Sequence, residues 1–138
     1  MERFFNTAGP MVPRLNYCID PLTRIDWEDV QRLIGNERYF IMHAPRQTGK
    51  TSALMAMMRT LNEEGRYACA YSNIEIAQPS RGDFTLGLPA VCGAVSSSLK
   101  YHLKRADLRK WFLEECMKMP PQEQLFEQIG RASCRERV

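Results

Sequence analysis

The sequence predicts an α/β fold in which helices flank a parallel sheet, and three observations lead to this prediction. Residues 39–42 (Tyr-Phe-Ile-Met) form a short apolar run typical of a buried parallel strand. Residues 51–64 then place apolar side chains at helical spacing before a glycine. Residues 66–76 alternate and carry β-formers, which indicates a second strand. Strand, helix and strand in this order predict a right-handed parallel βαβ unit.

The segments on either side of this unit are predicted to be turns and helices. Residues 4–25 are interrupted by prolines, which forbid a long helix, yet they are apolar enough to pack on the domain. Asp26 is a plausible N-cap for a helix that ends at Gly35. Residues 79–87 are rich in turn formers, and Pro89 suits the first turn of a helix that runs to about residue 104. Two more helices are expected, one capped by Asp107 and one beginning at residue 122.

The loop between the first strand and its helix matches the phosphate-binding pattern G-x-x-x-x-G-K-[ST], with Ala44 at the first glycine. Backbone N–H groups and the positive end of the helix are expected to surround a phosphate there. Lys50, the predicted catalytic residue, would lie across the β- and γ-phosphates, and the Thr51 hydroxyl would bind Mg²⁺. The predicted nucleotide-binding residues are Ala44, Pro45, Arg46, Gln47, Thr48, Gly49, Lys50, Thr51 and Ser52.

Hydrolysis by P-loop enzymes also needs an acidic residue at the end of a neighbouring strand. After Lys50 no apolar run ends in Asp or Asp-Glu; Glu75 is a weak imitation, and Asp20 lies before the loop. We therefore expect a P-loop fold truncated before the acidic strand. This chain would bind nucleoside triphosphate but would be poorly equipped to cleave it, whereas the full-length protein would be an ATPase.

The last ten residues, 129–138, can be encoded by a sequence that resembles a common sequencing-library adapter. They are expected to be a non-native tail. Their three arginines and one glutamate contribute +2 of the formal net charge of +3, so the remainder would carry +1. An ordinary basic C-terminal tail is the alternative. With the tail removed, the charge no longer suggests nucleic-acid binding.

Length and composition limit the class of protein. The 138 residues allow one domain or part of one, and 44% hydrophobic with 25% charged residues is typical of a globular protein. The five cysteines form no C-x-x-C pair, and no apolar run is long enough to span a membrane. A cytoplasmic protein is expected. The predicted organisation is a Pro-rich segment at 1–25, a partial nucleotide-binding domain at 26–128 and the tail at 129–138.

The chain resembles bacterial AAA-like ATP-binding proteins, of the group near the STAND and Orc/Cdc6-related ATPases. The resemblance rests on residues 5–10, 17–24, 43–51 and 65–68 and covers about 4–128. It implies ATP binding by the N-terminal part of an ATPase that acts as a switch or motor, with a protein or DNA partner left unidentified. It also implies that Tyr17, Pro21 and Arg24 lie on the adenine side of the site, although packing is an equal alternative for Tyr17 and Pro21.

Two other functions share the loop. A non-catalytic adaptor would bind nucleotide only to stay folded. A small-molecule or nucleotide kinase would need a lid with arginines, for which Arg81 and Arg105 are candidates. The sequence does not distinguish ATP from GTP.

Overall fold

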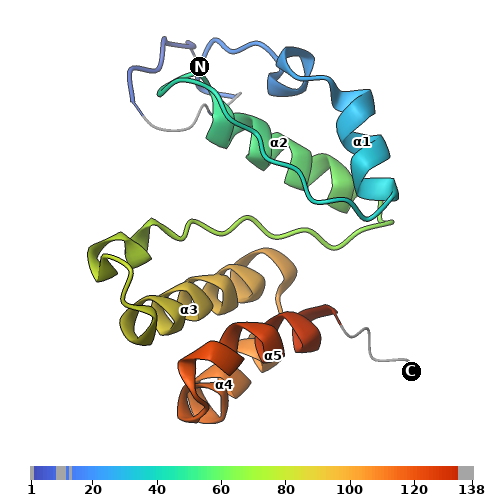
Figure 1. Ribbon diagram of the computed structural model, residues 1–138. Coiled ribbons are helices and arrows are strands. Elements are labelled where there is room, and N and C mark those ends of the chain that lie inside the picture. The colour runs from blue at the N-terminus through green and yellow to red at the C-terminus, as the bar shows by residue number, and fades with distance from the viewer. Residues whose placement is uncertain (1, 9–11, 13, 134–138) are drawn as a thin grey trace. The chain divides into compact units, whose positions relative to one another are not determined.

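The computed structural model describes residues 2–8, 12 and 14–133, and over these residues the chain is built from helices (Figure 1). Part of the predicted tail, residues 134–138, lies outside the described residues, as do Pro10 and Pro13 of the N-terminal segment. The α-helices are α1 (Trp27–Gly35), α2 (Lys50–Glu63), α3 (Phe84–Leu103), α4 (Ala106–Glu114) and α5 (Pro121–Ser133). Three short 3₁₀ helices are η1 (Pro21–Arg24), η2 (Glu75–Ser80) and η3 (Cys116–Lys118).

The predicted α/β fold is wrong. Both segments expected to be strands, 39–42 and 66–76, are irregular apart from the start of η2, and the described residues contain no sheet. One isolated bridge, between Phe4 and Asn16, is the only β-pairing found among them. Tyr39 and Ile41 are at least 90% exposed, so the apolar run is not buried. A strand is stable only when neighbours accept its backbone hydrogen bonds, and two candidate strands do not supply the three or more that a stable sheet needs.

The chain divides into two compact units, residues 1–67 and 68–138, which we describe separately. In the first unit, α1 has the bounds that the sequence predicts, α2 begins one residue before the predicted start, and η1 was not predicted. The Asp26 carboxylate caps α1 by accepting a hydrogen bond of 3.0 Å from the Asp29 N–H. Beyond the end of α2, Gly65 has φ +71°, a left-handed conformation that glycine adopts without steric cost.

Packing in the first unit is centred on α2. Its buried apolar residues are Ala53, Ala56, Met57 and Leu61. The helix η1, from the N-terminal segment, packs against α2. Asn16 is also buried and ties the N-terminal loop together, since its Oδ1 accepts from the Val12 N–H at 2.9 Å. This arrangement brings residues 17–25 next to the loop at residues 44–50.

In the second unit, α3 begins earlier than the sequence predicts. Asp83 caps it, with its carboxylate 2.9 Å from the Thr85 N–H, so Pro89 lies inside the helix rather than in its first turn. The expected turn at 79–87 is thus partly helical. The last helix, α5, begins one residue before the predicted start. Arg105, rather than Asp107, is the N-cap of α4.

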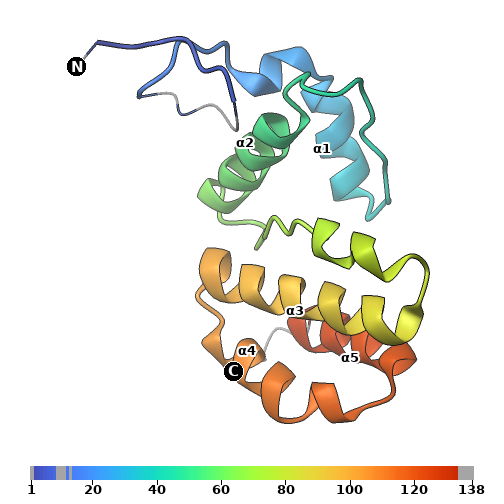
Figure 2. The ribbon, with the colours of Figure 1, turned by 90° about the vertical axis from the view of Figure 1, so that its left-hand side faces the viewer.

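Helices α3, α4 and α5 pack on one another and enclose an apolar cluster (Figure 2). The buried members of the cluster are Cys92, Trp111, Phe112 and Cys116, with Met119 and Leu125 at its edge. No helix among the described residues has the length and apolar character needed to cross a membrane.

Candidate functional site

The loop before α2 has the backbone conformation that favours anion binding. Gln47 and Gly49 have left-handed φ values of +57° and +86°, and Thr48 between them does not. Alternation of this kind turns successive N–H groups toward the same side of the backbone, which is the geometry of an anion nest. Gly49 is the N-cap of α2 and provides no side-chain cap, so the first N–H groups of the helix have no side-chain acceptor at that position.

Lys50 curls back over the loop that precedes it. Its Nζ donates hydrogen bonds of 2.7 Å to the carbonyl oxygens of Ala44 and Pro45. The Thr48 hydroxyl donates to the same Pro45 carbonyl at 2.7 Å. Hydrogen bonds from Lys50 thus link the end of the 44–50 loop to its beginning. The Lys50 ammonium group lies beside Ala44 and Pro45, at the opposite end of the loop from Gly49.

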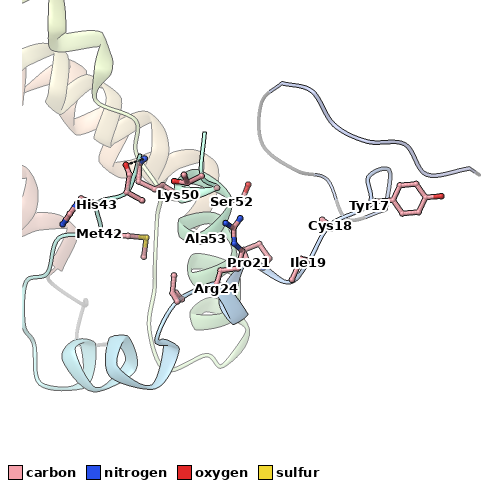
Figure 3. Close-up of a pocket in the computed structure, with 14 residues that line it drawn as sticks. Tyr17, Cys18, Ile19, Pro21, Arg24, Met42, His43, Lys50, Ser52 and Ala53 are labelled. Atoms are coloured by element: carbon pink, nitrogen blue, oxygen red, sulfur yellow. Dashed lines mark hydrogen bonds between the residues drawn. The ribbon is translucent and has the colours of Figure 1, made fainter. Parts of the chain in front are cut away.

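A cavity of about 460 Å³ lies beside this loop, within the range of small-ligand sites (Figure 3). One wall comes from the N-terminal segment, with Ile19, Pro21 and Arg24 among its residues. The other comes from the loop and the start of α2, including Gly49 and Lys50. Met42 also lines the cavity, and Figure 3 shows its side chain pointing toward Arg24 and Ala53.

The charge of the cavity is positive. Arg24 and Lys50 line it, and no aspartate or glutamate does so among the described residues. The acidic residues nearest in sequence already accept hydrogen bonds from backbone N–H groups. Asp20 accepts from the Leu22 N–H at 3.0 Å, and Asp26 caps α1. One end of the cavity therefore favours an anion, while the aliphatic residues of the other favour a flat apolar group.

Five of the nine predicted nucleotide-binding residues line the cavity: Ala44, Thr48, Gly49, Lys50 and Ser52. Pro45 takes part through its carbonyl group, which holds Lys50 and Thr48. Arg46, Gln47 and Thr51 have exposed side chains and do not line it.

The predicted Mg²⁺ site is incomplete in this structure. Thr51 is its only proposed ligand, and the cavity supplies no carboxylate among its described residues. No group of three or more His, Cys, Asp or Glu side chains with metal-binding geometry occurs in the described part of the chain. Mg²⁺ is held in proteins by carboxylates together with substrate phosphates, so these residues alone do not fit a bound magnesium ion.

Residues 17, 21 and 24, which the resemblance assigned to the adenine side, all line the cavity, but they differ in orientation. The Tyr17 ring points away from Lys50 (Figure 3) and packs on Phe5, with ring centroids 5.0 Å apart. Pro21 faces the start of α2, and Arg24 reaches the loop itself. Ile19 and Met42 are not predicted from the sequence as residues that line the cavity. Their spacing in the sequence does not distinguish the wall of a cavity from a buried core.

The residues considered for other activities belong to the second unit. Arg81 ends η2 in a left-handed conformation, and Arg105 is paired with Asp107 at 2.8 Å. Glu75, the weak candidate for a hydrolytic acid, is the first residue of η2. None of these three residues belongs to the first unit.

Searches against family models, curated proteins and solved structures find no match to this chain.

Proposed function

We propose that this protein binds a nucleoside triphosphate, with ATP as the first candidate, in the cavity of its first unit. The observation that carries the proposal is the combination of Gly49 and Lys50 in a loop of nest-like conformation with a positively charged cavity next to it. The motif supplies the phosphate end, and the cavity supplies room for the rest of the nucleotide.

In the proposed complex, the Lys50 ammonium group exchanges its two carbonyl acceptors for phosphate oxygens. The exchange is favourable because phosphate oxygens carry negative charge and the two carbonyl oxygens do not, so the ammonium group gains a direct charge–charge attraction. The N–H groups at the start of α2 donate to the same phosphates, and the helix dipole adds to the attraction. The base would lie against Ile19, Pro21 and Met42.

We propose binding without hydrolysis for the residues described. Cleavage of the γ-phosphate needs an acidic residue that helps to hold the metal ion and to position the attacking water molecule. Over the part of the chain that the structure describes, the cavity has no carboxylate for this task. A nucleotide-binding adaptor therefore fits the site better than an ATPase or a kinase, and phosphate release measured with the purified protein distinguishes them.

The test is titration calorimetry with ATP and GTP on the wild type and on Lys50→Ala. We expect Lys50→Ala to weaken triphosphate binding by about 100-fold or more, because a charged hydrogen-bond donor to phosphate is lost. Arg59→Ala is the matched control, since this exposed cation lies on the same helix and does not line the cavity. Equal affinity in Lys50→Ala and the wild type contradicts the proposal, as does a wild type that binds neither nucleotide.

A further inference from the structure

Arg24 is close to the glycine of the phosphate-binding loop. Its Nη1 lies 3.3 Å from the position that a Cβ on Gly49 would occupy. The guanidinium group thus approaches the backbone at the point where the loop turns into α2. In Figure 3 its nitrogen atoms lie beside the start of that helix, on the same side as Ser52 and Ala53.

The local structure of the N-terminal segment holds Arg24 in this place. Arg24 is the last residue of η1, whose first turn is capped by Asp20. The Thr23 hydroxyl donates to the Asp20 carbonyl oxygen at 2.7 Å, and η1 packs against α2. The side chain is therefore carried to the loop by a short helix that is itself fixed, not by a free chain.

No described carboxylate is paired with the guanidinium group. It makes no hydrogen bond or ion pair with any described residue. Lys50 lies at the Ala44–Pro45 end of the loop and Arg24 at the Gly49 end. Two cations thus approach one backbone nest from opposite ends, and an anion bound between them would be attracted by both.

We infer that Arg24 binds the phosphate groups of the nucleotide rather than its base, and this inference rests on the proposed function. A guanidinium group can offer two parallel N–H donors to one phosphate, which suits a planar contact that a lysine cannot make. Binding of the triphosphate would then add a ligand-mediated contact between Arg24 and the loop to the existing packing of η1 on α2.

The experiment compares ATP with inorganic tripolyphosphate, which carries the phosphates and no base. Titrations use the wild type, Arg24→Gln, Arg24→Lys and the control Arg59→Gln. We expect Arg24→Gln to weaken both ligands to a similar extent, by about tenfold to a hundredfold, because one charged donor is lost. Arg24→Lys should recover part of this loss, and Arg59→Gln should bind both ligands as the wild type does. Circular dichroism checks that each variant keeps its helices.

Three outcomes overturn the inference while leaving nucleotide binding in place. If Arg24→Gln loses affinity for ATP but keeps its affinity for tripolyphosphate, Arg24 acts on the base. If the wild type binds ATP but not tripolyphosphate, the phosphate groups alone are not bound by Arg24 and Lys50, and the inference fails. If Arg24→Gln binds both ligands as tightly as the wild type, Arg24 is not part of the site. Failure of the wild type to bind either ligand removes the proposed function itself, and this inference with it.

Discussion

The two units of this chain differ in what they bury. In residues 68–138, three helices enclose two large aromatic side chains, Trp111 and Phe112, between Cys92 and Cys116. Among the described residues of 1–67, the buried apolar ones all belong to one helix, and none of them is aromatic. The loop at residues 44–50 and the cavity beside it lie in this first unit, which has the smaller apolar core.

The difference shows how a site and a core can be separated within one short chain. Burial of aromatic side chains contributes most to stability, so the second unit is expected to resist unfolding. The first unit leaves apolar residues such as Ile19, Tyr39 and Ile41 exposed and gains less. A region of low local stability can become ordered when a ligand binds, which suits a binding site. Three predictions test this comparison, from the largest expected effect to the smallest.

Phe112→Ala should destabilise the second unit by about 3–5 kcal/mol, because it removes a buried ring and leaves a cavity. Urea unfolding followed by tryptophan fluorescence measures the effect. In a Trp27→Phe background, Trp111 is the only tryptophan and reports on the second unit alone. Exposed Leu113, mutated to Ala, is the matched control. If ATP affinity falls together with the stability of the second unit, the two units are coupled and the comparison fails.

Gly49→Ala should destabilise the first unit by about 1–3 kcal/mol, because an alanine at φ +86° is strained. Its Cβ would also come within 3.3 Å of the Arg24 Nη1. Trp27 fluorescence, read as the difference between the wild type and Trp27→Phe, follows this unit. Gly35→Ala lies in the last turn of α1, where a Cβ has no atom within 4 Å, and serves as the control. An unchanged unfolding midpoint in Gly49→Ala would contradict the strained loop.

The third prediction concerns alkaline pH. Burial, together with the nearby Cys116 thiol, raises the pKa of Cys92 from 9.0 to about 11. Above pH 9 the unfolded chain loses this proton while the folded chain keeps it, so the free energy of unfolding falls as pH rises from 9 to 11. The contribution is fully present below pH 9. Urea unfolding of the second unit at several pH values measures the slope.

Cys92→Ala is the control, and it should show a smaller slope than the wild type in this range, whatever its stability at pH 7. The exposed Cys18, mutated to Ala, should leave the slope unchanged. Equal slopes in the wild type and in Cys92→Ala would show that this thiol does not titrate differently in the two states.

Much of the local structure follows from nearby residues. Asp26 accepts a hydrogen bond from a nearby N–H, and Gly65 ends a helix because its own φ is positive; such features depend on a few neighbours in sequence. The positions of Gly49 and Lys50 in the loop belong to the same class. The start of α3 is predicted too late, because the prediction uses the preference of Pro89 for a first turn and not the ability of Asp83 to cap the helix.

The sheet was predicted from residues 39–42 and 66–76, whose composition favours strands, but composition does not provide the partners that a strand requires. Most of the helices and caps, and the loop that matches the pattern G-x-x-x-x-G-K-[ST], can be read from the sequence, since they depend on interactions within a few residues. The exposure of the apolar run, the approach of Arg24 to Gly49 and the shared cavity of the two cations follow from the tertiary structure. These three features depend on contacts between residues that are far apart along the chain, so no local sequence pattern predicts them.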